Sequence, residues 1–319
     1  MAPILEVQDL TTNYRTLSGW VRAAEGVNFQ VEPGEALGLA GESGCGKTTV
    51  ALSLLKILPQ GGVIRDGKII LDGTDIVPLS EKEMRKLRWK KIAIVFQGAM
   101  NAMNPVYKVG DQIVEAIRTH EPHADNRDAR ERARKLFELV GIDPERVDNY
   151  PHEFSGGMRQ RALIAMALAA NPKVLIGDEP GTALDVIVQA QTLKLMRDLK
   201  DKLGLSMLLI SHDLSIIAET CEKVAIMYAG RIVEYGDAQS IFKEPLHPYT
   251  QGLIKAFPAL TGERIRLTSI PGQPPDLLHP PPACRFNPRC PYVMDVCKKV
   301  DPPLQKSGSG DHLVACHLY

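Results

Sequence analysis

Apolar and polar residues alternate along the start of the chain. The segments ILEVQDLTTNYRT and RAAEGVNFQVEPGEALGLAG follow this period of two around Pro-Gly breaks, which is typical of short strands joined by turns. After Gly46 the spacing becomes helical, in KTTVALSLLKIL. We therefore predict a β-rich start that leads into a helix.

Three later apolar runs, KIAIVF, KVLIGDE and SMLLISHD, are typical of short strands buried on both faces. Between the first two lies a charged region in which RDARERARKLFELV is amphipathic with a helical period. Strands that alternate with helices indicate an α/β domain with a mostly parallel sheet. We expect this domain to end after VAIMYAGRIVEYG, and we divide the chain into residues 1–240 and 241–319.

The second of these segments differs in composition. Its stretch SIPGQPPDLLHPPPACRFNPRCPY is dense in proline, which is incompatible with a regular helix or a central strand. We expect a small, loop-rich C-terminal extension there.

Charge and length narrow the class of protein. The 319 residues are 44% hydrophobic, and 38 basic residues balance 38 acidic ones, which disfavours binding to nucleic acid or to an anionic membrane surface. No apolar run reaches the roughly 18 residues that span a bilayer. The start MAPILEVQDL also lacks the features of a signal peptide, so we expect a soluble chain that is not exported.

A phosphate-binding loop is predicted at residues 41–48, where GESGCGKT matches G-x-x-x-x-G-K-[ST] between a predicted strand and helix. Backbone N–H groups of such a loop surround phosphate oxygens. We expect Lys47 to reach the terminal phosphates, Thr48 to bind Mg²⁺ and Cys45 to be a small neutral filler. The positions assigned to ATP are Gly41, Ser43, Gly44, Cys45, Gly46, Lys47, Thr48 and Thr49.

Two carboxylates end the predicted strand VLIGDE, at the sheet edge where α/β proteins bind ligands. We expect Asp178 to hold Mg²⁺ and Glu179 to orient and polarise the water that attacks the γ-phosphate. An acidic strand end is usually a solvated edge, but downstream of a phosphate loop the catalytic role is favoured.

The segment FSGGMRQ, residues 154–160, precedes a helical run just upstream of that strand. It resembles the signature sequence of the ABC ATPases. Ser155, Gly156 and Gly157 would form a second phosphate-binding helix N-terminus; an ordinary N-cap serine would not account for the position of the motif. The resemblance implies a P-loop ABC ATPase with an antiparallel β subdomain, a helical subdomain and a head-to-tail dimer in which each signature closes over the other subunit's ATP.

Three further positions fall in the order of this family. Gln97 resembles the glutamine that contacts Mg²⁺ and the attacking water and senses the membrane partner. Asp185, in the sequence ALD, resembles the loop that communicates across the dimer, and His212 resembles the histidine that contacts the γ-phosphate. A single histidine at a strand end is more often structural, but its place in this order favours the catalytic role.

Aromatic and glycine positions are less specific. Tyr14 is our first choice for the adenine platform and Trp20 is its rival, while a core aromatic role stays open. Gly177 and Gly181 stand where the family more often has alanine and threonine. Neither touches a charged catalytic group, so we expect activity to survive.

The tetrapeptide HPYT at 247–250, the proline-rich tail, NAMNPVY at 101–107 and PHEFSGGMRQR point to a subfamily. They resemble the oligopeptide and dipeptide importer ATPases, although for His247 and Tyr249 themselves an ordinary turn is favoured. The resemblance implies a peripheral subunit on the cytoplasmic side of the cell membrane. Its partners would be two transmembrane permease subunits, a related second ATPase in a heterodimer, and an extracellular solute-binding protein.

Four cysteines of the tail, Cys284, Cys290, Cys297 and Cys316, are spaced C-x₅-C-x₆-C-x₁₈-C. In a cytosolic protein bound metal is favoured over disulfides. The dipeptide-importer ATPases carry a [4Fe–4S] cluster in a similar tail, so the resemblance implies a structural cluster. Zinc, which His312 or His317 could help to bind, and free thiols or a disulfide stay open.

These observations predict an ATPase that drives the import of peptides. A soluble ABC ATPase that acts on nucleic acid or ribosomes is the alternative, but the sequence lacks the tandem domains, coiled-coil insertion or basic face it would need. A subunit with vestigial ATP binding is disfavoured because Glu179 and His212 are present. Dipeptides, oligopeptides, oligosaccharides and nickel all stay open as the solute.

Overall fold

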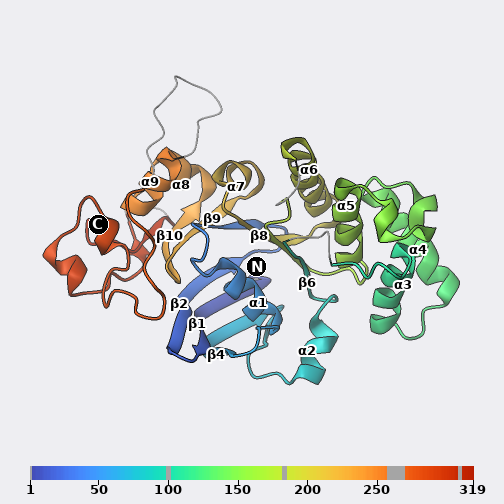
Figure 1. Cartoon of the computed structure of the whole chain (residues 1–319), viewed down its shortest axis with the longest axis horizontal. Coiled ribbons are helices and arrows are strands. Elements are labelled where there is room, and N and C mark those ends of the chain that lie inside the picture. Colours follow the sequence, from blue (N-terminus) through green and yellow to red (C-terminus); the bar gives the residue numbers. More distant parts are fainter. Residues whose placement is uncertain (1, 98–101, 182–184, 257–269, 308–310) are drawn as a thin grey trace.

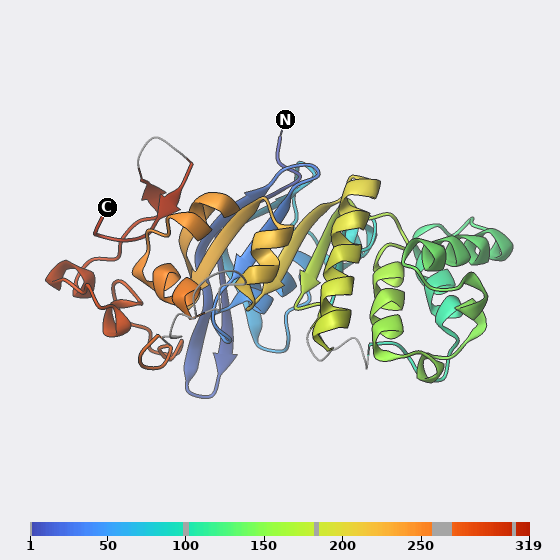
Figure 2. The same ribbon diagram turned by 90° about the horizontal axis from the view of Figure 1, so that it is seen from above.

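A computed structural model describes residues 2–97, 102–181, 185–256, 270–307 and 311–319. Two sheets lie at the centre of an elongated molecule (Figure 1). A helical part occupies one end and the C-terminal segment the other, as the view from above also shows (Figure 2).

The first sheet is antiparallel and has the strand order β2-β1-β4-β5. β1 (Leu5–Thr16) pairs with both β2 (Gly19–Val31) and β4 (Gly62–Leu71), and β5 (Thr74–Asp75) extends the edge. Buried and exposed residues alternate over much of β1 and β2, because successive side chains of a strand face opposite sides. The predicted β-rich start is confirmed.

The second sheet has the order β11-β12-β10-β9-β3-β8-β7-β6. Its parallel strands are β3 (Ala36–Ala40), β6 (Ile92–Val95), β7 (Val174–Asp178), β8 (Ser206–Ser211) and β9 (Lys223–Tyr228). Every residue of β3, β7 and β8 is buried, as in strands covered on both faces. The prediction of an α/β fold with a mostly parallel sheet is confirmed.

Both faces of this sheet are covered. α1 (Lys47–Leu55) and the antiparallel sheet share a core with one face, and the other face packs against α5 (Gly156–Ala167), α6 (Val186–Leu203) and α7 (Leu214–Thr220). The remaining α-helices of the described chain are α2 (Glu81–Leu87), α3 (Val109–His120), α4 (Asn126–Leu139), α8 (Ala238–Lys243) and α9 (Pro248–Lys255). The sheet is thus held rigidly between two apolar layers.

The helical end is built from α3, α4 and α5, with short 3₁₀ turns at Pro144–Asp148 and Pro151–Glu153. α4 is the predicted amphipathic segment, and it buries Ala129, Ala133 and Phe137 on one face. The predicted helical insertion between β6 and β7 is therefore confirmed.

The C-terminal segment returns to the core sheet. After the antiparallel strand β10 (Arg231–Asp237), the chain forms short 3₁₀ turns at Asn287–Arg289 and Asp295–Lys298, then β11 (Gln305–Lys306) and β12 (Leu313–Val314). β12 pairs with β10, so the tail completes an edge of the sheet. Within the described ranges, none of the helices has the length and apolar composition that a membrane crossing requires.

Candidate functional site

The phosphate loop joins β3 to α1 and is held close to neighbouring backbone. Gly41 and Gly46 have φ angles of +151° and +108°, in the region that favours glycine. A Cβ atom at Gly41 would collide with the carbonyl oxygen of Met227, and one at Gly46 with that of Ala23. The two glycines are needed for the path of this loop.

Lys47 folds back across the loop. Its Nζ donates hydrogen bonds to the carbonyl oxygens of Gly41 (2.7 Å) and Glu42 (3.0 Å) and lies 3.7 Å from Cys45 Sγ. Burial raises the pKa of the Cys45 thiol, which favours its neutral form. The loop positions open to solvent are Ser43, Gly44 and Thr48, whereas Thr49 is buried.

Asp178 lies at the end of β7 beside the start of α1. Thr48 Oγ1 donates to Asp178 Oδ1 at 3.3 Å. Burial raises the pKa of Asp178, and the charge of Glu179 raises it further against the opposing effects of Thr48 and Lys47. A buried carboxylate next to a hydroxyl offers the oxygen ligands that Mg²⁺ prefers, so these residues suit the predicted ion.

Glu179 is where three loops meet. Its backbone has a φ of +48°, and its N–H donates to the carbonyl oxygen of Ile210 in β8. Gln97 Nε2 donates to Glu179 Oε2 at 2.9 Å, and His212 Nδ1 lies 3.2 Å from Glu179 Oε1. Gln97 and His212 follow β6 and β8, so parallel strands bring all three side chains to one edge of the sheet.

The signature motif starts α5, and Ser155 is its N-cap. Ser155 Oγ accepts a hydrogen bond from the Met158 amide at 3.3 Å. At Gly157 a Cβ atom would lie only 2.8 Å from Val188 of α6, so Gly157 lets the two helices pack closely. α5 belongs to the helical end and α1 to the centre (Figure 1, Figure 2). The signature therefore does not meet the phosphate loop of its own chain.

Asp185 caps α6, where its carboxylate accepts a hydrogen bond from the Val188 amide at 2.9 Å. It is exposed. Ala183 and Leu184, the other residues of the predicted dimer loop, lie outside the described residues.

The two aromatic candidates lie on the antiparallel sheet. Tyr14 of β1 pairs with Val21 of β2 and Gly62 of β4. The Arg65 guanidinium covers one face of the Trp20 ring, 3.9 Å from its centroid. The Tyr14 ring has a neighbour as well, since a Cβ atom at Gly62 would lie 2.8 Å from Tyr14 Cε1.

The four cysteines of the tail line one small cavity, together with His247 and Phe286. Burial raises the pKa of Cys284 to about 11, and the other three thiols add to the effect. Burial likewise raises the pKa of Cys290 and Cys316. Among the described residues, no group of three or more His, Cys, Asp or Glu side chains has the geometry to hold a single metal ion.

The two histidines that we considered for zinc have other partners. His312 Nε2 lies 2.7 Å from Oε1 of the buried Glu234. His317 Nε2 lies 2.9 Å from the carbonyl oxygen of Val300, although its ring also borders the cysteine cavity. The structure therefore gives His312 a role in joining the tail to the core sheet.

Sequence reasoning missed a set of contacts between the tail and the phosphate loop. His247 caps α9 by accepting a hydrogen bond from the Tyr249 amide, in line with the structural role that we favoured. Tyr249, however, accepts a hydrogen bond from the Glu42 amide at 2.9 Å, and Arg289 forms an ion pair with the Glu42 carboxylate. A hint in the sequence is the place of Arg289, directly before Cys290.

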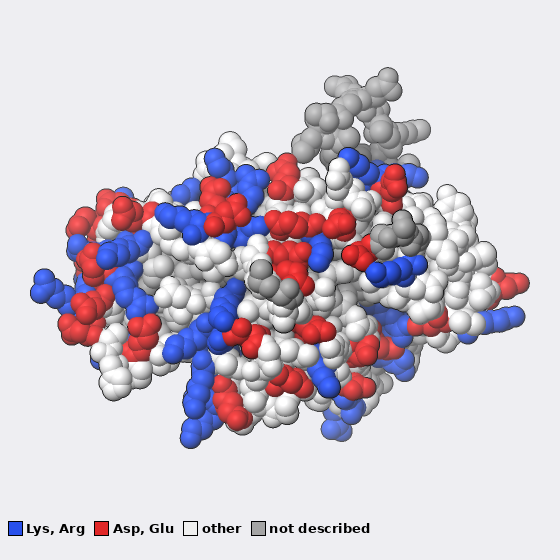
Figure 3. All heavy atoms as spheres, turned by 180° about the vertical axis from the view of Figure 1, so that it is seen from behind, with Lys and Arg blue, Asp and Glu red and all other residues white. Residues whose placement is uncertain are grey.

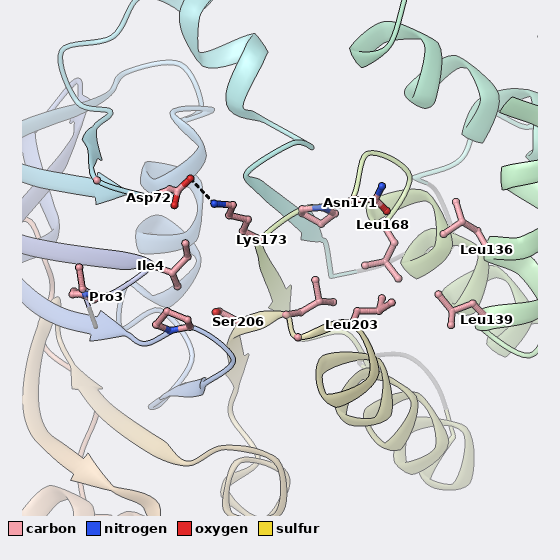
Figure 4. A pocket seen from close by; sticks show the side chains of 16 residues that line it. Pro3, Ile4, Asp72, Leu136, Leu139, Leu168, Asn171, Lys173, Leu203 and Ser206 are labelled. Atoms are coloured by element: carbon pink, nitrogen blue, oxygen red, sulfur yellow. Dashed lines mark hydrogen bonds and ion pairs between the residues drawn. The ribbon is translucent and has the colours of Figure 1, made fainter. Parts of the chain in front are cut away.

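A cleft of about 870 Å³ lies at the opposite end of the parallel strands. It is bordered by Lys173 and Ser206, at the amino ends of β7 and β8, and by leucines of the helical part. Figure 4 shows Lys173 reaching toward Asp72, in the turn that joins β4 to β5; Lys173 Nζ lies 2.8 Å from Asp72 Oδ2.

Charged side chains of both signs are interspersed on the face in Figure 3. This distribution agrees with the equal numbers of basic and acidic residues in the chain. The visible face offers no broad basic surface of the kind that nucleic-acid binding uses.

Comparison with known families and proteins shows two matching regions. The family described as "ABC transporter" matches residues 24–182, and that described as "Oligopeptide/dipeptide transporter, C-terminal region" matches residues 233–297. The oligopeptide transport ATP-binding protein OppD of Bacillus subtilis is 50% identical over 95% of this chain and 86% of its own length. The dipeptide transport ATP-binding protein DppD of the same organism is 45% identical over 100% of this chain and 95% of its own.

Solved structures agree with these matches. CbiO1 from Clostridium perfringens, part of the ABC transporter complex cbiONQ, is 30% identical and covers 76% of this chain and 92% of its own, with a TM-score of 0.66. The ATP-binding cassette MJ0796, a dimer bound to ADP and Pi, shares the fold at 23% identity, over 73% of this chain and 98% of its own, with a TM-score of 0.65. This chain is an ABC-type ATPase that belongs to the ATP-binding subunits of the oligopeptide and dipeptide importer family.

Proposed function

We propose that this chain binds and hydrolyses Mg-ATP at its phosphate loop and thereby drives the import of peptides. The observation that carries the proposal is the meeting of catalytic side chains at one sheet edge. Thr48 contacts Asp178, and Gln97 and His212 both contact Glu179. Chemistry at a phosphate needs this combination of a metal-binding carboxylate and a base that orients water.

Each residue has a distinct role. Glu179 orients and polarises the attacking water, and its contacts with Gln97 and His212 hold the carboxylate in place. His212 is exposed and contacts the γ-phosphate. Thr48, Asp178 and Gln97 would hold Mg²⁺, which neutralises charge on the phosphates.

A second subunit completes the site. Ser155, Gly156 and Gly157 start a helix, where N–H groups bind phosphate, and this helix is remote from its own phosphate loop (Figure 1). We infer that they close over ATP held by a partner ATPase in a head-to-tail heterodimer, that Asp185 signals across it, and that adenine stacks on Tyr14.

The division at residue 240 separates a nucleotide-binding domain from an importer-specific extension in this proposal. Relatives named for oligopeptide and dipeptide transport support peptides as the solute. Two transmembrane permeases and an extracellular solute-binding protein would complete the importer, with this chain on the cytoplasmic face of the membrane.

Peptide uptake by cells that lack the chain tests this function. Complementation with the wild-type chain or with Lys82→Ala, an exposed lysine of α2, should restore uptake, whereas Lys47→Ala should not. Restored peptide uptake with Lys47→Ala would contradict the proposal. A loss of oligosaccharide or nickel uptake alone would reassign the solute.

We further propose that the four tail cysteines hold a [4Fe–4S] cluster that acts as a structural cross-link. Four thiols around one cavity support it, because such a cluster spreads its ligands over four irons. The cluster would supply a covalent connection within a proline-rich segment. Cys284 and Cys290 come from one stretch of it, and Cys316 follows the strand that joins the core sheet.

Anaerobic purification followed by absorbance and metal analysis tests the cluster. We expect a broad band near about 400 nm and about four irons and four sulfides per chain. Cys290→Ser should lose them, while Cys221→Ser, a buried cysteine of the core, should not. One zinc per chain, or no metal, would contradict the cluster.

A further inference from the structure

The second residue of the phosphate loop is held by the C-terminal extension. Arg289 Nη1 and Nη2 donate to the two carboxylate oxygens of Glu42, at 2.7 and 3.0 Å. Tyr249 of α9 binds the backbone of the same residue, since its hydroxyl accepts from the Glu42 amide. Both the side chain and the main chain of Glu42 are therefore fixed by residues that lie beyond the core domain.

The ion pair is well ordered by its surroundings. The Arg289 side chain is only 4% exposed, against 26% for Glu42. Its Nε donates to the carbonyl oxygen of Pro271 at 2.8 Å, and its guanidinium lies 5.7 Å from the Tyr228 ring centroid. Bidentate hydrogen bonding to a carboxylate requires the planar guanidinium group of arginine.

Glu42 also contacts Lys47, the lysine of the phosphate loop. The Glu42 carbonyl oxygen accepts a hydrogen bond from Lys47 Nζ, as does the carbonyl oxygen of Gly41. A shift of Glu42 would therefore move the groups that position Lys47. The path from tail to phosphate site consists of two contacts, Arg289 to Glu42 and Glu42 to Lys47.

A second path starts at the other end of the same tail segment. Arg285 donates to Glu25 of β2 at 2.5 Å and to the carbonyl oxygen of Ala229. The next residue, Gly230, donates its N–H to the carbonyl oxygen of Cys45 in the phosphate loop. Arg285 directly follows Cys284, and Arg289 directly precedes Cys290. Both arginines are therefore adjacent in sequence to cysteines that line the cavity.

We propose that Arg289 is a positioning residue of the nucleotide site, and that the group bound by the tail cysteines sets ATP affinity through the Arg289–Glu42 pair. The proposal rests on the proposed nucleotide and cysteine sites. A bound group fixes Cys290 and with it the guanidinium, which keeps the phosphate loop in its binding conformation. Loss of the group frees the segment and loosens the loop.

Dissociation constants for a fluorescent ATP analogue test the pair. Glu42→Gln and Arg289→Met should each weaken binding by about tenfold, the effect of one strong charged hydrogen-bonded contact. The double variant should bind no more weakly than either single variant, because both remove one interaction. Arg289→Lys should resemble Arg289→Met, and KM should rise while kcat stays within about twofold.

A matched control is Arg132→Met. Arg132 forms an ion pair with Glu121 and bonds the carbonyl oxygen of Ala169 in the helical part, away from the loop, and its loss should leave ATP affinity unchanged. Cys290→Ser should bind ATP as weakly as Arg289→Met, with no further loss when the two are combined. Arg289→Met itself should keep the absorbance of the cysteine-bound group.

The positioning role of Arg289 would be overturned if Glu42→Gln and the folded Arg289 variants bound the ATP analogue with wild-type affinity. Loss of binding in Lys47→Ala would show that the proposed nucleotide site itself is correct. Wild-type affinity in Cys290→Ser that has lost its bound group would overturn the link to the cysteines. If Arg289→Met does not fold, Glu42→Gln and Arg289→Lys decide the question. Failure of the wild-type chain to bind ATP would instead contradict the proposed function.

Discussion

His247 shows how burial makes one side chain sensitive to pH. The residue is 1% exposed, and its amide donates to the buried carboxylate of Glu234. Burial lowers the pKa of His247 to about 4, against a smaller opposing effect of Glu234. As the pH falls below about 6.5, His247 is protonated in the unfolded chain, whereas in the folded chain it stays neutral until about pH 4. Stability is therefore lost across this window.

Denaturant unfolding between pH 7.5 and 4.5 checks this effect. His247→Asn keeps an acceptor for the Tyr249 amide but does not titrate. We expect the free energy of unfolding of His247→Asn to fall less steeply with decreasing pH than that of the wild type. Between pH 7.5 and 4.5 the wild type should lose up to about 3 kcal/mol more than the variant. His123→Asn, at an exposed position, should follow the wild type. Equal slopes for His247→Asn and the wild type would rule out the assignment.

Gly177 offers a test of the unusual residues beside the acidic pair. A Cβ atom there would lie 2.9 Å from the terminal methyl of Met196, a flexible group, and 3.3 Å from Leu209 and Pro180. Gly177→Ala should change the free energy of unfolding by less than about 1 kcal/mol and keep ATP hydrolysis.

The matched variant is Gly110→Ala, where the added Cβ would collide with the side chain and backbone of Val147. Thermal unfolding should show a clear loss of stability, by about 1–3 kcal/mol. A larger loss in Gly177→Ala than in Gly110→Ala would contradict the packing described for β7.

At the residue scale, the sequence alone was sufficient to predict the site residues that belong to a motif. Lys47, Thr48, Asp178 and Glu179 stand at fixed places relative to strands and helices, and the structure brings them to one edge. The Arg289–Glu42 pair joins residues 247 positions apart. No local pattern encodes such a distant partner, so only the fold shows it.

At the scale of elements, two serine caps with similar geometry carry different expectations. Ser155 caps α5 and Ser80 caps α2, each accepting a hydrogen bond from the amide three residues on. Ser155→Ala and Ser80→Ala should each cost about 1 kcal/mol of stability. ATP hydrolysis should be lost in Ser155→Ala alone, because in the proposed heterodimer only that helix start closes over nucleotide.

Phosphate release together with sedimentation in the presence of ATP distinguishes these variants. Mixed with the partner ATPase, Ser155→Ala should still bind ATP through its own phosphate loop but fail to form the ATP-bound heterodimer. Equal hydrolysis by the Ser155 and Ser80 variants would remove α5 from the nucleotide site.

Periodic elements were predictable and short ones were not. β6, β7 and β8 appear as apolar runs, and α4 as an amphipathic segment. β12 has two residues, too few for any period, and its pairing with β10 depends on the path of the whole tail. The return of the extension to the core sheet was therefore beyond sequence reasoning.

At the scale of the whole molecule, the candidate catalytic residues lie on the central sheet, between the helical part and the C-terminal segment. The helical end carries α5, which begins with the signature, and α1 after the phosphate loop lies at the centre (Figure 1). This arrangement supports the proposal that a second subunit completes the site. The opposite end packs Arg289 against Glu42 of that loop and Arg285 against Glu25 of β2. The proposed function therefore requires that nucleotide chemistry takes place at the sheet edge that carries Glu179.

Single-turnover hydrolysis by the heterodimer of this chain with its partner ATPase tests this requirement directly, with the phosphate-loop lysine of the partner replaced and the protein in excess over radiolabelled ATP. We predict that the wild type converts bound ATP to ADP and that Glu179→Gln retains ATP while converting it at least about 100-fold more slowly. Conversion by Glu179→Gln at the wild-type rate would contradict the account.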